Sequence, residues 1–203
     1  AGASTPETRA AWERLFADGL DGKPIVRIVC THGHPDHIGL ADWVGERFGA
    51  PLWITLGEFG VARILSAGLP GQGGENSAAH LRRNGLADEG MLGQIAARMV
   101  RHFPTLVPSV ARSFRRIRDG ESIAIGGRDW QVITGIGHSP EHATLYCEAD
   151  GLMLSGDMVL PRISTNVAVW EMEPESDPVD WYMDSLRRMA HCRDDTLVLP
   201  SHG

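Results

Sequence analysis

The stretch Thr31-His32-Gly33-His34-Pro35-Asp36-His37 places four potential metal ligands within six residues. It follows the apolar run at 25–30, which predicts a strand, and its proline suits the first position of a helix. The first two histidines are two positions apart, so on an extended segment both side chains point to the same side. The carboxylate and the third histidine then fall in the first helical turn, close to them. Such a nitrogen- and oxygen-rich cluster suits Zn²⁺, and less often Fe²⁺ or Mn²⁺.

Three later motifs also contain metal-type ligands, and each follows a strand-like apolar segment. They are Gly137-His138-Ser139-Pro140, Ser155-Gly156-Asp157 and Ser201-His202-Gly203. A metal site built at the ends of strands requires this arrangement.

Taken in order, the four motifs resemble those of the metallo-β-lactamase superfamily, and within it the glyoxalase-II-like (hydroxyacylglutathione hydrolase-like) branch. The resemblance covers nearly the whole chain. It implies an α/β (α+β) fold, an αβ/βα sandwich of two mixed sheets flanked by helices.

The resemblance also implies a binuclear metal site, with two Zn²⁺ ions per chain as the first expectation. His32, His34 and His138 would hold the first metal, Asp36, His37 and His202 would hold the second, and Asp157 would bridge them. His34 stands where diiron, oxygen-reducing relatives carry Glu, which favours zinc and hydrolysis over iron; Fe²⁺ and Mn²⁺ remain alternatives. Thr31 and His142 are expected to orient ligands without touching the metals.

The implied activity is metal-dependent hydrolysis of a thioester, ester or lactone, with attack by a hydroxide that bridges the metals. Asp36 would be the catalytic carboxylate, orienting the hydroxide and carrying a proton to the leaving group. Two alternatives remain open. One is a mononuclear iron sulfur dioxygenase that uses His32, His34 and His138 as ligands and leaves the other residues of the set around them without metal contact. The other is a non-catalytic binding or signalling protein on the same scaffold.

The composition is that of a globular enzyme with one sizeable core: 203 residues, 42% hydrophobic and 22% charged. No apolar run approaches the roughly 20 residues of a membrane span, so no membrane partner is expected. The three cysteines, Cys30, Cys147 and Cys192, are widely scattered. Free thiols in a reducing compartment, and hence a cytoplasmic location, are the expectation.

The net charge of −7 bears on the partners. Nucleic acid is disfavoured because phosphate binding needs a basic surface. The one basic concentration, at 112–118, is interpreted as the solvated side of a helix. A small-molecule acyl substrate is the expected partner, and homo-oligomerisation is left open.

The hydrophobic patterns predict one domain in which helices alternate with strands. Expected helices cover 6–18, with Trp12, Leu15 and Phe16 buried, and then 36–48 and 179–192. Expected strands are 25–30, 52–55, an antiparallel set at 122–125, 129–136, 143–148 and 151–154, and finally 196–199. A helical insertion at about 58–118 is broken by the glycine-rich stretch 68–74.

Several residues near these motifs are interpreted as structural. His80, His102 and His191 lack ligand spacing, and the stripe of Leu92, Ile95, Met99 and Phe103 is interpreted as packing. Glu141, Asn166 and the segment 170–177 are expected at the surface. Because relatives begin with further strands and continue into further helices, we expect the chain to be a fragment of a longer protein.

Overall fold

The computed structural model describes residues 1–68 and 74–203, with the side chains of 99–101 left out. The interior of the predicted glycine-rich break lies outside these residues. The described strands form two sheets. One contains β1 (Ile28–Val29), β2 (Leu52–Ile54) and β3 (Arg115–Arg116); the other contains β4 (Ser122–Ile125), β5 (Arg128–Gly135), β6 (His142–Cys147), β7 (Leu152–Gly156) and β8 (Leu197–Pro200).

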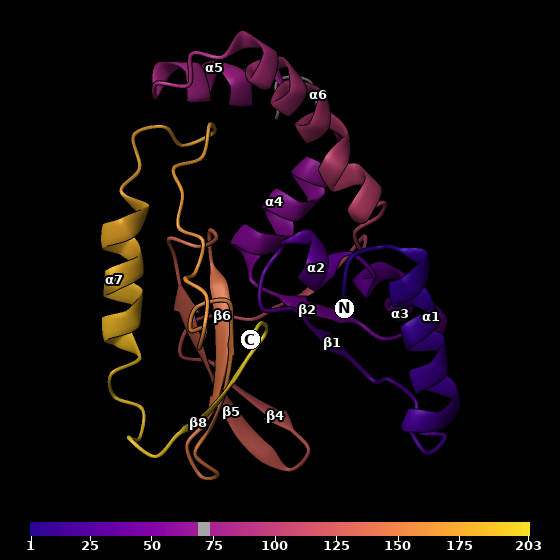
Figure 1. The fold of residues 1–203 in the computed structure, drawn as a ribbon. Helices are drawn as coiled ribbons and strands as arrows, with labels where there is room; N and C mark the ends of the chain where they lie inside the picture. The colour runs from indigo at the N-terminus through magenta and orange to yellow at the C-terminus, as the bar shows by residue number, and fades with distance from the viewer. Residues whose placement is uncertain (69–73) are drawn as a thin grey trace.

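Helices flank the pair of sheets on both sides (Figure 1). On the side of the small sheet lie α1 (Pro6–Arg14), continued by a π-helical turn (Leu15–Gly19), α2 (Pro35–Ile38), α3 (Ala41–Phe48) and α4 (Leu56–Ser66). The helix α7 (Pro178–Arg188) lies against the large sheet, and α5 (Glu75–Arg83) and α6 (Glu89–Leu106) extend above both. This is the predicted α/β sandwich with helices outside two sheets.

The large sheet confirms the predicted antiparallel run. β4 to β7 pair antiparallel in sequence order, and β8 joins β7 in parallel. The β4–β5 turn passes through Gly126 and Gly127, which both have positive φ angles that suit a tight hairpin. The buried face of β5 and β6 then packs around Val132, Ala143 and Leu145.

The small sheet differs from the prediction in three respects. Its described strands are all parallel, so only the larger sheet is mixed. The segment 25–30 contributes only the two paired residues of β1. The last of its strands, β3, falls inside the predicted helical insertion. Arg115 and Arg116 form this strand, and Arg112 and Arg118 lie in the irregular segments beside it instead of on a helix. Pairing with β2 overrides the local helical pattern there.

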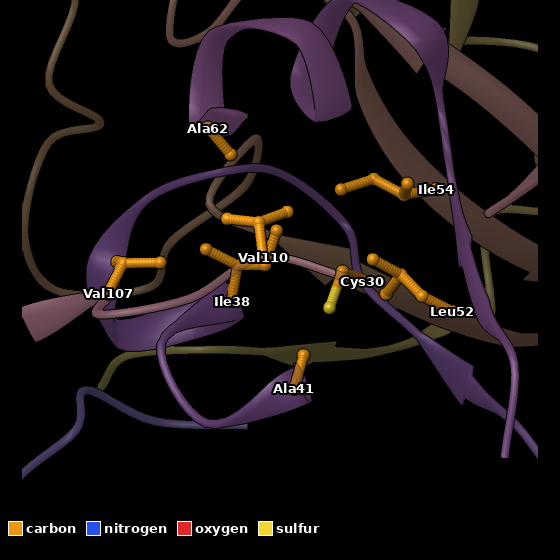
Figure 2. Close-up of a cluster of buried hydrophobic side chains, with 8 residues drawn as sticks. All are labelled: Cys30, Ile38, Ala41, Leu52, Ile54, Ala62, Val107 and Val110. Atoms are coloured by element: carbon orange, nitrogen blue, oxygen red, sulfur yellow. The ribbon is translucent and has the colours of Figure 1, made fainter. Parts of the chain in front are cut away.

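An apolar cluster fixes the metal-loop helices against the small sheet (Figure 2). Cys30 at the end of β1 packs with Ile38 of α2, Leu52 and Ile54 of β2, and Val107 beyond α6. Cys30 is only 3% exposed and directly follows the last residue of β1. The described structure records all three cysteines as free thiols.

Two helix predictions needed correction. The expected helix at 36–48 is interrupted near Gly39 and Leu40, where Leu40 departs from helical geometry with φ −104° and ψ 6°. In the first helix Leu15 is 40% exposed, contrary to expectation. Its neighbours Trp12 and Phe16 are half-buried, and Phe16 packs its ring edge-on against Phe48 at 4.9 Å. The helix is therefore anchored by aromatic contacts at the surface of α3.

No helix among the described ranges combines the length and apolar character needed to span a membrane.

Candidate metal centre

The sequence positions the first ligands where β1 gives way to α2. His34 is the residue before the helix and has extended geometry, with φ −67° and ψ 152°. Pro35 begins the helix, as its fixed φ favours. Asp36 and His37 therefore lie in the first turn, as predicted, on the same loop as the two histidines of the extended segment.

Two glycines allow the later ligands to approach. Gly137, just before His138, has φ +102°, and a Cβ there would lie 2.4 Å from the carbonyl oxygen of Pro178. Gly156, just before Asp157, has φ +54°, and a Cβ would lie 2.4 Å from His142 Nε2. Only glycine satisfies both the backbone angle and the space at these positions.

The seven predicted ligands come together in two adjacent groups. The first contains His32, His34, His138 and Asp157, and the second contains Asp36, His37 and His202. In the first group, His32 Nε2 lies 3.0 Å from His34 Nδ1 and 3.2 Å from His138 Nε2. His80, His102 and His191, which were interpreted as unrelated to the site, are in neither group.

Asp157 faces both groups. One of its carboxylate oxygens lies 3.5 Å from His138 Nε2 and 3.5 Å from His202 Nε2. The other lies 3.3 Å from His37 Nε2. His202 is also 3.2 Å from Asp36, whose side chain is 52% exposed. The second group therefore opens toward solvent, whereas the first is enclosed.

The donor set fits a pair of divalent cations. The facing atoms His37 Nε2 and Asp157 Oδ1 are buried and have no hydrogen-bond partner among the described residues. Around a four-coordinate zinc ion with Zn–N bonds of roughly 2.0–2.1 Å, neighbouring ligand atoms lie roughly 3.4 Å apart. The observed separations of the ligand atoms in the first group, from 3.0 to 3.9 Å, span this value.

Groups around the site orient the ligands. The Nδ1–H of His138 donates to the backbone carbonyl of Asn166 at 2.8 Å, which leaves Nε2 free to face the cluster. Asn166, expected to be an uninvolved loop residue, thus acts through its backbone. The Thr31 hydroxyl lies 3.0 Å from His32 Nδ1. His142 is fully buried, and its Nε2 accepts the backbone N–H of Asp157 at 3.1 Å. Thr31 and His142 thus lie beside the ligands, where they were expected.

The sequence interpretation missed Glu58, at the start of α4. This carboxylate is only 1% exposed and accepts from the backbone N–H of Gly33 at 2.7 Å. It also accepts from the Ser139 hydroxyl at 2.6 Å and the backbone N–H of Glu141 at 2.8 Å. Glu58 therefore ties the first ligand loop to the loop that follows His138. Its only signal was a carboxylate four residues after a strand, which is too common to identify it.

Glu141 also differs from expectation. Its side chain is 26% exposed, and its carboxylate accepts from the backbone N–H of Gly57 at 2.7 Å. Together with Glu58 it anchors the start of α4 beside the site.

Burial and neighbouring charge set the pKa values of the metal-free cluster. Burial lowers the pKa of His34 to about 4 and that of His142 to about 3, and it lowers the pKa of His32 strongly. Burial also opposes the charge on His37, but the carboxylates of Asp157 and Asp36, 3.3 and 3.4 Å from its Nε2, outweigh it and raise the pKa to about 9. Burial raises the pKa of Glu58. Most of these histidines are neutral, as metal ligands must be.

The comparisons with known proteins agree with this geometry. The sequence model of the metallo-beta-lactamase superfamily matches residues 1–202, and the chain belongs to this superfamily. The probable metallo-hydrolase YqjP of Bacillus subtilis (strain 168) is 30% identical over all of this chain and 62% of its own length.

Two solved structures are similar over the whole chain. A beta-lactamase domain protein from Burkholderia ambifaria is 45% identical, with a TM-score of 0.91 over 56% of its length. The metallo-beta-lactamase family protein TTHA1429 from Thermus thermophilus is 27% identical, with a TM-score of 0.78 over 63% of its length. The chain thus spans less than two thirds of each of these relatives. The fold implies divalent metal binding, and the histidine and aspartate cluster is where it would occur.

Proposed function

We propose that this chain carries a binuclear, zinc-dependent hydrolase site that cleaves a thioester, ester or lactone. The observation that carries the proposal is the position of Asp157. Its carboxylate faces both ligand groups. One of its oxygens lies 3.3 Å from His37 Nε2, and neither of these two buried atoms has a hydrogen-bond partner among the described residues. A bridging carboxylate between two cations accounts for both atoms.

The ligands divide as the two groups suggest. His32, His34 and His138 would hold one cation, Asp36, His37 and His202 the other, and Asp157 both. Two such cations supply Lewis acidity toward a carbonyl oxygen and lower the pKa of a shared water. Metal ligation requires each of the five imidazoles to be neutral, so with two carboxylates the pair of dications would keep a net positive charge, which preserves that acidity.

Asp36 is the residue best placed to act on the reacting atoms. The His37 imidazole, 3.4 Å away, holds the pKa of Asp36 well below its usual range, so Asp36 is a carboxylate at neutral pH. It also lies at the exposed edge of the site. We assign it the role of accepting a hydrogen bond from the attacking water and passing a proton to the departing group on the solvent side.

The second ligand group argues for two metals over one. A mononuclear iron dioxygenase would need only His32, His34 and His138, yet Asp36, His37 and His202 also converge within 4.8 Å of one another. Elemental analysis of the purified protein, paired with a panel of thioesters, esters and lactones, tests the proposal. About two zinc ions per chain and chelator-sensitive hydrolysis are expected. About one iron per chain with oxygen uptake would instead establish the dioxygenase, and a full metal set with no turnover on any ester or thioester would favour a binding role.

A further inference from the structure

A cavity of about 580 Å³ opens directly beside the first ligand group. Gly33 and His34 form part of its wall, so a molecule in the cavity would reach the metal loop. The remaining wall comes from α4, from the segment that follows β5, from residues 168–176 and from the start of α7. The volume is within the usual range of small-molecule sites.

The wall of this cavity is mainly apolar. Val61 and Leu65 line it from α4, Ile136 from the end of β5, and Trp170 and Trp181 from the opposite side. The ring of Trp170 lies 6.0 Å from the His34 imidazole, so the apolar surface continues to the metal loop. Trp170 was expected at the surface and instead belongs to the cavity wall. Its segment is held by the Ser77 hydroxyl of α5, which donates to Glu171 at 2.8 Å.

The charge of the wall disfavours anionic ligands. Among the described residues that line the cavity there is no lysine or arginine. The two charged groups are both acidic: Glu58, whose oxygens are already hydrogen-bonded, and the exposed Glu173. A carboxylate in the cavity would lose water without gaining a cationic partner. Glutathione, which carries carboxylates, is poorly matched to it.

The position of the cavity relative to the ligands indicates which part of a substrate it takes. It borders His34 of the enclosed group, and its wall includes none of Asp36, His37 and His202. Since Asp36 is at the exposed edge, the leaving group would depart on that side. The acyl group of the substrate would then bind in the cavity.

We propose that this cavity is the acyl pocket of the hydrolase and that it selects an uncharged, apolar acyl chain or aryl-acyl group. This inference rests on the proposed function, and it replaces acyl-glutathione with esters or thioesters of neutral hydrophobic acids as the substrate class.

The test is a comparison of kcat/KM on two matched series with metal-loaded protein. In the first series, 4-nitrophenyl esters run from acetate through butyrate and hexanoate to octanoate. In the second, acetate esters carry alkyl leaving chains of the same lengths. Because each added methylene group would move from water into the apolar cavity, kcat/KM should rise up to about fourfold per added carbon in the first series. In the second series kcat/KM should change little. Mono-4-nitrophenyl succinate should be cleaved at least tenfold more slowly than the butyrate. A rise confined to the second series would overturn the acyl assignment.

A pair of neighbouring apolar residues on α4 provides a matched variant and control. Leu65→Ala should flatten the dependence on chain length, and Leu65→Arg should reverse the preference between the succinate and butyrate esters. Ile64→Ala, whose side chain is 37% exposed and outside the cavity wall, should change neither. Isothermal titration with octanamide gives a readout apart from turnover, and Leu65→Arg should weaken this binding at least tenfold.

The two proposals fail in different ways. If the metal-loaded protein hydrolysed none of the esters but still bound octanamide, and Leu65→Arg weakened that binding, the hydrolase proposal would be wrong and the apolar pocket would be supported. Chelator-sensitive hydrolysis that is indifferent to acyl length and to Leu65→Arg would overturn the pocket alone.

Discussion

The buried carboxylate of Glu58 accepts the backbone N–H of Gly33, the residue between His32 and His34, at 2.7 Å. The same carboxylate accepts from Ser139, the residue after His138. One side chain from α4 therefore fixes the spacing between two ligand motifs that are about one hundred positions apart.

Glu58→Gln should weaken metal binding although it removes no ligand. The Glu58 carboxylate accepts hydrogen bonds through both of its oxygens. In glutamine one of these oxygens is replaced by an NH₂ group, which cannot accept. The donor that loses its acceptor lowers the free energy of unfolding by about 1–3 kcal/mol. Loss of such a supporting contact typically lowers metal affinity about 10–100-fold. Competition with a chromophoric chelator measures the affinity. Glu175→Gln, at an exposed position, is the control, and equal affinity in both variants would show that Glu58 does not support the ligands.

Asp157→Asn tests the bridge. The substitution keeps the size of the side chain but removes the negative charge that two cations would share. We expect metal content to fall from about two toward one per chain, and kcat to fall about 10²-fold or more, since an activated shared water is lost. Inductively coupled plasma analysis and ester hydrolysis give the two readouts. Normal stoichiometry with normal turnover would rule out a bridging role.

His34→Ala should remove an imidazole of the first group and abolish hydrolysis while leaving the fold intact. His102→Ala and His191→Ala should retain nearly full turnover, because both side chains are exposed and belong to neither ligand group. Circular dichroism verifies the fold of each variant. Turnover of His34→Ala at the level of these controls would refute the ligand assignment.

Gly156→Ala should destabilise the protein more than Gly127→Ala does, since the second substitution strains only the backbone. An alanine there meets both a positive φ and the His142 ring at 2.4 Å. Gly127→Ala shares the positive φ, at +76°, but has no heavy atom within 4 Å of its Cβ. Urea denaturation should give a loss of about 1 kcal/mol for Gly127→Ala and at least about 2 kcal/mol more for Gly156→Ala. Equal losses would mean that the site accommodates the methyl group.

The stability of the metal-free protein should pass through a maximum near pH 6.5. The pKa values of His32, His34 and His142 are lowered by burial, so below 6.5 the unfolded chain binds more protons and stability falls with the pH. Each histidine that stays neutral in the folded protein lowers the free energy of unfolding by about 2 kcal/mol between pH 6.5 and pH 5. The pKa of His37 is raised to about 9, so its contribution is complete below 6.5 and is lost between 6.5 and 9.

Urea unfolding of chelated protein at pH 5, 6.5 and 9 measures this profile. His37→Gln should remove most of the decline on the alkaline side and leave the acid side unchanged. A decline at pH 9 that persists in His37→Gln would assign it to other groups.

The four ligand motifs and their order could be predicted from the sequence, because they depend on local chemistry. His32 and His34 alternate on an extended segment, and Pro35 begins the helix that presents Asp36 and His37. The antiparallel strands β4 to β7 were also predictable, since their alternating patterns and glycine turns act over neighbouring residues.

Residues whose partners are distant in sequence acquire their roles through the fold, and these roles could not be predicted from the sequence. The local pattern predicts a helix up to residue 118, but residues 115 and 116 form β3 because they pair with β2, which is distant in sequence. Likewise, Glu58 is an ordinary acidic residue of a helix until the fold buries it beside Gly33 and Ser139. Trp170 and Leu65 face one cavity for the same reason. Burial and long-range contact arise from packing, which the order of residues along one segment does not specify.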